Sequence, residues 1–312
     1  MWLTRLFILL PWLSLAPALM AEILPPPQQL APHSYVWIGP YGPPTPDNHG
    51  FRMNLGFVVG SDAVAVIDSG YSSGMAREML THIRAVTDLP VRYVINTNSQ
   101  PHRILGNAVF RGQGAEIIAA SEAVPRILEE GPAMADTAER ILELPDDSIQ
   151  PPARPDMVLE ETTEIDLGEI ALEITLAGTA HTAGSLIVRV PADKVIYAGD
   201  LLYAGRLLAV LPVSHVGNWI AAFDRLRSYP EDPLFVPGHG EPGMLSTFVA
   251  PTYDYLVSLK EHMDNAVDAG IPMQDAIDSL DQSAWQHLAD FQALAGRNAH
   301  RTYLEREAAA FE

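Results

Sequence analysis

The chain of 312 residues contains no cysteine. It therefore forms no disulfide bond, and it offers neither a thiolate metal ligand nor a cysteine nucleophile. Any metal ion would have to be bound by nitrogen and oxygen ligands, of which imidazole and carboxylate side chains are the main sources.

Basic residues are also few. The sequence has 19 Lys and Arg against 39 Asp and Glu, a formal net charge of −20 at pH 7. A surface of this sign repels phosphate backbones, so we expect no nucleic-acid partner.

Long apolar runs are absent after the first residues. The run at 6–15 is interrupted by Pro11 and is shorter than the roughly 20 residues that span a bilayer. It follows the positively charged Arg5 and precedes small residues that end at Ala21. This order is typical of an export signal, so we predict that residues 1–21 are a signal peptide and that the mature protein is periplasmic or secreted, without stable membrane insertion. A retained N-terminal anchor is the alternative.

The rest of the chain alternates between short apolar strands and helical segments, which predicts an α/β fold. We expect a proline-rich irregular lead-in at 25–46, one domain over 22–312 with its core at about 50–245, and C-terminal helices over 250–310. Strands are predicted at 54–59, 63–68, 91–97, 116–120, 164–166, 172–176, 186–190, 194–198 and 234–236. Helices are predicted at 72–86, 104–110, 122–142, 218–227, 252–269, 273–280 and 284–310.

Five motifs follow one another in an order that resembles the metallo-β-lactamase superfamily. They are Ala-Val-Ile-Asp-Ser-Gly at 65–70, Gly-Asn at 106–107, Ala-His-Thr-Ala-Gly-Ser at 180–185, Ala-Gly-Asp at 198–200 and Pro-Gly-His-Gly at 237–240. The resemblance implies an αββα sandwich, with two mixed β-sheets face to face and helices outside. Residues 199–206 and 219–226 further resemble a periplasmic branch associated with sulfur oxidation and quinoprotein dehydrogenase systems.

The family hydrolyses its substrates with a metal-held hydroxide, because zinc lowers the pKa of bound water to about 7. Its usual metal loop reads His-x-His-x-Asp-His. Here the corresponding residues 98–103 read Asn-Ser-Gln-Pro-His-Arg. Asn98 and Gln100 replace the two histidines of the first metal, His102 replaces the aspartate, and Arg103 replaces the last histidine.

The resemblance leaves four candidate metal ligands, which are His102, His181, Asp200 and His239, and of these His102 and Asp200 are also the catalytic candidates. Two interpretations stay open. In one, no metal binds and Arg103 forms an ion pair with Asp200; in the other, His102, Asp200 and His239 hold one Zn²⁺. A direct pair between Arg103 and Asp200 would favour the first, and an arginine turned outward the second.

Four residues are candidates for ligand binding: Asn98, Gln100, Arg103 and Tyr203. A fixed guanidinium favours a carboxylate or phosphate group. The apolar segment 207–213 could be core or could line a pocket. The sequence thus predicts a hydrolase-like periplasmic protein with reduced or lost hydrolysis, which binds a small molecule or a periplasmic protein. The alternative is a mononuclear zinc hydrolase of an ester, thioester or lactam.

Overall fold

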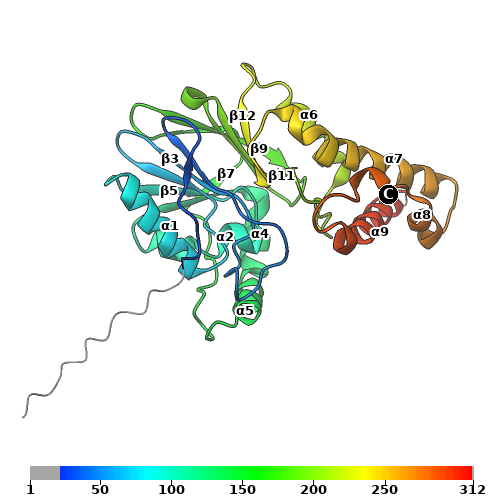
Figure 1. Ribbon diagram of the computed structural model, residues 1–312, viewed down its shortest axis with the longest axis horizontal. Coiled ribbons are helices and arrows are strands. Elements are labelled where there is room, and N and C mark those ends of the chain that lie inside the picture. Colours follow the sequence, from blue (N-terminus) through cyan, green and yellow to red (C-terminus); the bar gives the residue numbers. More distant parts are fainter. Residues whose placement is uncertain (1–21, 311–312) are drawn as a thin grey trace, which may run out of the picture.

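A computed structural model describes residues 22–310 of the chain, so the predicted signal peptide at 1–21 lies outside the described residues. Two β-sheets pack face to face, and helices cover their outer surfaces (Figure 1). Both sheets mix parallel and antiparallel pairs, which confirms the αββα sandwich. Within the described residues, no helix is long and apolar enough to cross a membrane.

The first sheet has seven strands that lie in sequence order. They are β1 (Gln28–Gln29), β2 (Ser34–Trp37), β3 (Leu55–Val59), β4 (Val64–Ile67), β5 (Val91–Ile95), β6 (Glu116–Ala120) and β7 (Met157–Leu159). Strands β1 to β4 pair antiparallel, whereas β4 to β7 pair parallel. Parallel neighbours need crossover connections, and helices lie in all three of them here.

The helices of the first half are α1 (Ser73–Val86), α2 (Pro101–Ile104), α3 (Asn107–Arg111), α4 (Val124–Glu129) and α5 (Gly131–Ile141). The side chain of Ser72 caps α1 by accepting a hydrogen bond from the backbone N–H of Met75 at 3.2 Å. Pro101 occupies the first turn of α2, where its missing N–H costs nothing.

The second sheet has five strands in the order β12-β11-β10-β9-β8. They are β8 (Thr163–Asp166), β9 (Ala171–Gly178), β10 (Ser185–Val190), β11 (Val195–Tyr203) and β12 (Leu234–His239). The pairs from β8 to β11 are antiparallel, and β11 pairs parallel with β12.

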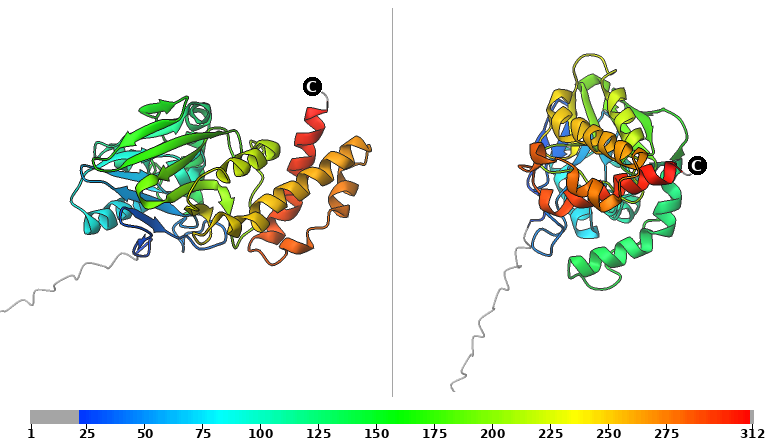
Figure 2. Two further views of the ribbon diagram at one scale, coloured as in Figure 1. Left: turned by 90° about the horizontal axis from the view of Figure 1, so that it is seen from above. Right: turned by 90° about the vertical axis from the view of Figure 1, so that its right-hand side faces the viewer.

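The helices of the second half are α6 (Val216–Leu226), α7 (Tyr255–Asp268), α8 (Met273–Ser279) and α9 (Phe291–Ala309). Helices α7, α8 and α9 form a lobe beside α6 that projects away from α1 to α5 (Figures 1 and 2).

Alternating side chains on the strands build separate cores. On β4, Val64 and Val66 face the helices α1 to α5, whereas Ala65 and Ile67 face the second sheet. Tyr197 lies in the same core between the sheets, and Trp219 lies in a third core that packs the second sheet against α6, α7 and α9. The first sheet is buried on both faces, which explains why its strands read as continuous apolar runs.

Three sequence-based expectations differ from the structure. The lead-in at 25–46 is not wholly irregular, because β1 and β2 extend the first sheet from it. The helix expected over 122–142 is divided at Glu130, where Gly131 and the following proline begin α5. The last helix begins at Phe291 rather than at 284, after Asp290 adopts a left-handed conformation (φ 63°).

Candidate functional site

The candidate residues meet where strands of both sheets end. Asp68 follows β4, Asp200 lies within β11 and His239 ends β12. The loop 98–103 follows β5 and runs into α2, and His181 lies between β9 and β10. The carboxyl ends of parallel strands meet at one edge of a sheet, so motifs that are far apart in sequence are brought together here.

Arg103 lies at the centre of this group and is 1% exposed. Its Nη2 and Nε atoms donate to the two carboxylate oxygens of Asp200 at 2.7 and 3.1 Å. Its Nη1 atom donates to Asp68 at 3.0 Å and to the carbonyl of Asn54 at 2.7 Å, and Nη2 also donates to the carbonyl of Gly238 at 3.2 Å. A guanidinium has five N–H groups, and all five are used inside the protein.

Gly238 makes this arrangement possible. A Cβ atom at that position would lie 2.7 Å from Nη2 of Arg103 and closer still to Asp200. The glycine of the Pro-Gly-His-Gly motif therefore leaves room for the ion pair.

The two aspartates respond differently to Arg103. Burial alone raises the pKa of Asp200, but the charge of Arg103 holds the pKa well below its usual range. Burial raises the pKa of Asp68 to about 6, although Arg103 and two hydrogen bonds from Thr97 oppose this. Asp200 is thus the carboxylate that Arg103 neutralises most strongly.

Asn98 and Gln100 take the places next to the ion pair. The Asn98 amide nitrogen donates to Asp200 at 2.8 Å, and its oxygen accepts the backbone N–H of Gln100 at 2.8 Å. The Gln100 side-chain amide contacts Nε2 of His181. That imidazole nitrogen is 4.0 Å from Asp200, so Gln100 occupies the side of His181 that faces the other ligand candidates.

His102, Asp200 and His239 each offer one ligand atom, and these atoms lie within 4.8 Å of one another. Nδ1 of His239 donates to the carbonyl of Arg52 at 2.8 Å, which leaves a lone pair on Nε2, 3.4 Å from Asp200. Nε2 of His102 is buried, also 3.4 Å from Asp200, and has no hydrogen-bond partner among the described residues. Burial lowers the pKa of His102 to about 3 and the pKa of His239 well below its usual value, so both rings are neutral at pH 7. Neutral imidazoles beside a carboxylate are zinc-type ligands.

Arg103 nevertheless prevents these residues from fitting a tightly bound divalent ion. Both oxygens of Asp200 already accept hydrogen bonds from Arg103, and one accepts a second from Asn98. A dication about 4 Å from a guanidinium is repelled by about 8 kcal/mol at an effective dielectric constant of 20. Arg103 would have to leave its five partners before Asp200 could serve a metal.

A pocket of about 330 Å³ opens beside this network. Gln100, His102, Tyr203 and His239 line it, and Tyr203 stacks on His239 with ring centroids 5.1 Å apart. Of the candidate ligand-binding residues, Asn98 and Arg103 are buried in the network and do not line the pocket, whereas Gln100 and Tyr203 do. His181 is fully buried and lies against the edge of Trp219.

The sequence left the direction of Arg206 open and gave no site role to Arg52, Asp290 or Arg297, and all four residues line the pocket. Arg52 lies between β2 and β3, Arg206 follows β11, Asp290 precedes α9, and Arg297 lies within α9. Arg206 ends the segment 199–206 that resembles the periplasmic branch, whereas Arg52, Asp290 and Arg297 belong to no recognised motif, and for these two arginines only the scarcity of basic residues could have drawn attention.

Comparison with known proteins gives both relatives and structural neighbours. The chain is 30% identical to the acyl-coenzyme A thioesterase MBLAC2 of Gallus gallus over 92 residues, which cover 28% of this chain and 33% of that protein. It is 26% identical to the Bos taurus protein of the same name over 218 residues, which cover 61% and 74%. The first alignment thus spans only a third of its relative.

Two solved structures share the fold. A metallo-β-lactamase from Pontibacter korlensis superposes with a TM-score of 0.58 at 21% identity, covering 74% of this chain and 98% of the other. A double mutant of the sec-alkyl sulfatase PisA1 superposes with a TM-score of 0.66 at 15% identity, covering 90% and 51%. The family model described as "Metallo-beta-lactamase superfamily" matches residues 50–239, which is more than half of the chain. The chain therefore belongs to the metallo-β-lactamase superfamily.

Proposed function

We propose that this chain is a hydrolase-family protein that binds a small molecule or a protein partner, with hydrolysis reduced or lost. The bidentate pair between Arg103 and Asp200, at 2.7 and 3.1 Å, is the observation that carries the proposal. The guanidinium supplies a fixed positive charge to Asp200, but it cannot lose a proton and cannot present an open coordination position. It therefore replaces the electrostatic role of a cation without its chemistry.

The proposal includes export to the periplasm. The order of charge, apolar run and small residues in 1–21 supports it. The chain is held in place directly after that segment, because the backbone N–H groups of Ile23 and Leu24 donate to the carboxylate of Glu78. Intact mass measurement on protein from a periplasmic extract tests this part, and a chain beginning at Glu22 is expected.

Metal content tests the main proposal. Mature protein without a histidine tag is incubated with zinc, dialysed and measured by plasma mass spectrometry. We expect less than about 0.1 equivalent of zinc in the wild type, because Arg103 repels the ion. The variant Arg103→His is expected to retain more zinc, since it removes the charge and adds an imidazole.

Arg84→His is the matched control, because it adds a histidine at an exposed arginine in α1. It should leave the zinc content unchanged. One full equivalent of zinc in the dialysed wild type would reject the metal-free proposal, whatever the variants show.

A second function is favoured by the two neutral imidazoles beside Asp200 and by the thioesterase relatives. This is a mononuclear zinc hydrolase of an ester, thioester or lactam, with His102, Asp200 and His239 as ligands. It predicts that zinc raises the turnover of a chromogenic thioester and that His239→Ala abolishes both zinc retention and turnover. Turnover that is unchanged in His239→Ala would exclude it.

A further inference from the structure

Arg103 cannot recognise a ligand, because its five N–H groups are used inside the protein. The pocket beside it is nevertheless positively charged. Three arginines line it (Arg52, Arg206 and Arg297), and Asp290 is the only acidic residue among its lining residues. This local excess of positive charge, in a chain with a net charge of −20, would favour an anion.

The arginines differ in how they are paired. Arg206 is 4% exposed, and its Nε atom lies 2.9 Å from the carboxylate of Asp290. Arg52 and Arg297 form no ion pair with a carboxylate in the part of the chain that the structure describes, and Nε of Arg52 is buried without a hydrogen-bond partner there. Burial, and after it the nearby charge of Arg206, lower the pKa of Arg52. An anion between Arg52 and Arg206 would remove this repulsion.

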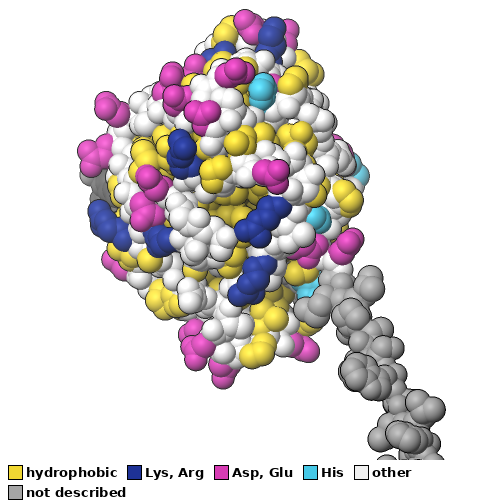
Figure 3. Space-filling model, turned by 90° about the vertical axis from the view of Figure 1, so that its left-hand side faces the viewer, with side chains coloured by type: hydrophobic (Ala, Val, Ile, Leu, Met, Phe, Trp, Pro, Cys, Tyr) yellow, Lys and Arg dark blue, Asp and Glu magenta, His cyan; other side chains and the backbone are white. Residues whose placement is uncertain are grey.

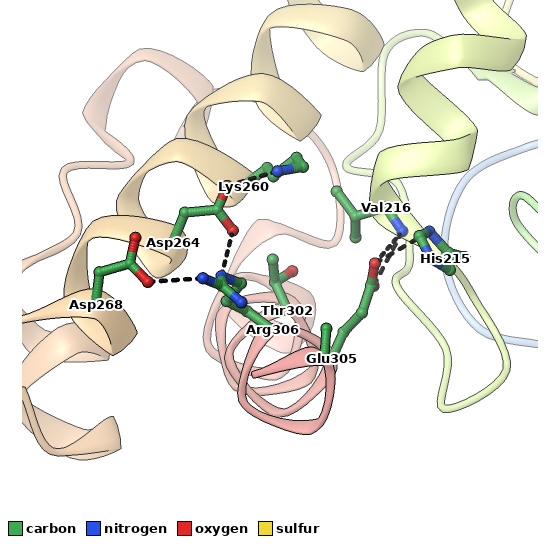
Figure 4. A pocket seen from close by; sticks show the side chains of 9 residues that line it. His215, Val216, Lys260, Asp264, Asp268, Thr302, Glu305 and Arg306 are labelled. Carbon is green, nitrogen blue, oxygen red and sulfur yellow. Dashed lines mark hydrogen bonds and ion pairs between the residues drawn. The ribbon is translucent and has the colours of Figure 1, made fainter. Parts of the chain in front are cut away.

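A second pocket has a different arrangement of charges. It lies between α6, α7 and α9 and has a volume of about 430 Å³ (Figure 4). There Arg306 pairs with Asp264 and Asp268 at 3.3 and 2.6 Å, and His215 pairs with Glu305 at 3.2 Å. Both cations of this pocket, Lys260 and Arg306, pair with carboxylates of its own lining, so the lining offers no unpaired positive charge to an anion.

The positively charged end of the first pocket is held rigidly. The backbone N–H of Leu207 donates to the carbonyl of Ala289 at 2.9 Å, and that of Ala289 donates to the carbonyl of Gly205 at 3.0 Å. These bonds flank Arg206 and fix it relative to the start of α9. A preorganised donor binds an anion with less loss of conformational entropy.

Apolar side chains also line the pocket, namely Ala209, Leu211, Ala293 and Leu294. A neighbouring hollow of about 450 Å³ shares Ala209, Leu211 and Leu294 with it, together with Arg297, and is also lined by Arg301. The two hollows therefore adjoin along the segment after β11 and the first turns of α9. Their shared wall can accommodate a hydrocarbon chain that leaves the charged end.

We infer that this pocket binds an amphiphilic anion, with its anionic head between Arg52 and Arg206 and its hydrocarbon chain along Ala209, Leu211 and Leu294. The inference rests on the proposed binding function, and it adds the chemical class of the ligand. Tight binding requires both the charged head and the hydrocarbon chain, so we expect neither a short anion nor a neutral alcohol to bind tightly.

Isothermal titration of EDTA-treated mature protein tests the inference with octanoate, acetate and octan-1-ol as probes. Octanoate should bind at least tenfold more tightly than acetate, which lacks the chain, and than octan-1-ol, which lacks the charge. Equal binding of octanoate and octan-1-ol, or no binding of octanoate, would overturn the inference.

Two variants test which residues contact the anionic head and which contact the hydrocarbon chain. Arg52→Gln should weaken octanoate at least tenfold and leave octan-1-ol unchanged, whereas Leu294→Asn should weaken both. Arg84→Gln, at an exposed arginine in α1, is the matched control and should change neither. An Arg52→Gln variant that folds and binds octanoate like the wild type would overturn the placement of the head.

The same titration on zinc-treated protein separates this inference from the metal-free proposal. If octanoate binds only when zinc is present, and binds Arg52→Gln as tightly as the wild type, its head lies on a metal and the inference is overturned. A protein that retains zinc but still loses octanoate binding in Arg52→Gln would reject only the metal-free proposal.

Discussion

At the scale of single residues, Arg103 determines the character of the site. The sequence predicts that it stands where the family's metal loop ends in a histidine, and its guanidinium binds both Asp200 and Asp68. In this protein an arginine side chain is therefore the group that neutralises Asp200.

Removing Arg103 should be costly. Arg103→Met leaves two buried carboxylates without their counter-charge, and breaking a buried pair in this way costs about 3–5 kcal/mol of unfolding free energy. Urea denaturation of the EDTA-treated protein measures the loss. Arg111→Met is the control, because the pair of Arg111 with Asp156 is partly exposed and should contribute less than about 1 kcal/mol. A loss below 1 kcal/mol in Arg103→Met would mean that the ion pair does not hold the site together.

The buried histidines predict a dependence of stability on pH. Burial lowers the pKa of His102 to about 3 and that of His181 to about 4, and it holds the pKa of His239 well below its usual value. In the unfolded chain all three take up protons near pH 6.5, whereas the folded protein does not, so stability is lost as the pH falls below about 6.5. Asp68 has the opposite effect on stability. Its pKa is raised to about 6 in the folded protein, so the folded state takes up this proton at a higher pH than the unfolded chain does, which offsets part of the loss.

We therefore expect the unfolding free energy of metal-free protein to decrease by several kcal/mol between pH 7 and pH 4, at about 1.4 kcal/mol per pKa unit. Urea denaturation across this range measures it. The decrease should be smaller in His102→Gln and unchanged in His287→Gln, whose side chain is exposed on the surface. A free energy that does not change with pH would show that these histidines are not neutral in the folded protein.

At the scale of elements, the segment 207–213 serves both roles that the sequence left open. Leu207, Leu208 and Val210 are buried, whereas Ala209 and Leu211 line the pocket. Asn298 of α9 holds this segment: its side chain accepts the N–H of Val210 and donates to the carbonyl of Leu208, both at 2.8 Å. The last helix thereby positions the apolar wall of the site.

Asn298→Ala should destabilise the protein by about 2–4 kcal/mol, because it leaves two buried backbone groups without partners at about 1–3 kcal/mol each. Thermal and urea denaturation measure this, and octanoate binding should weaken with it. Asn218→Ala, at an exposed position in α6, is the control and should change stability by less than about 0.5 kcal/mol. If Asn298→Ala is as stable as this control, α9 does not fix the segment.

At the scale of the whole molecule, the negative charge is distributed over the surface. The face drawn in Figure 3 carries scattered acidic side chains among hydrophobic and neutral ones. A formal charge of −20 on one chain implies mutual repulsion that salt screens.

We expect the melting temperature to rise between 10 and 300 mM of a monovalent salt. For a domain of this size, a gain of about 1 kcal/mol corresponds to roughly 2–4 °C. Calorimetry with sodium chloride and with sodium acetate measures the change in melting temperature. If the two salts raise it equally, the cause is screening of charge rather than binding of one of the anions. A melting temperature that falls with salt would show that attractive ion pairs outweigh the repulsion.

The fold could be predicted from the sequence because two kinds of signal lie along the chain itself. The periodicity of apolar residues predicts strands such as 63–68 and helices such as 72–86, and the motifs at Asp200 and His239 identify the family. The strands β1 and β2 could not be predicted, because the prolines around them indicate turns. Only the pairing of β2 with β3, and of β1 with β2, makes this segment extended.

The sequence by itself determined the superfamily, and it predicted that Asn98 and Gln100 stand in place of metal-loop histidines and that Arg103 has two possible orientations. Only the tertiary structure decided that Arg103 turns inward to Asp200, because that direction depends on Asn54, Asp68 and Gly238, which come from different strands and loops. Only the tertiary structure gathered Arg52, Arg206 and Arg297 around one pocket. Charge density in space follows the packing of distant segments, and no spacing along the chain records it.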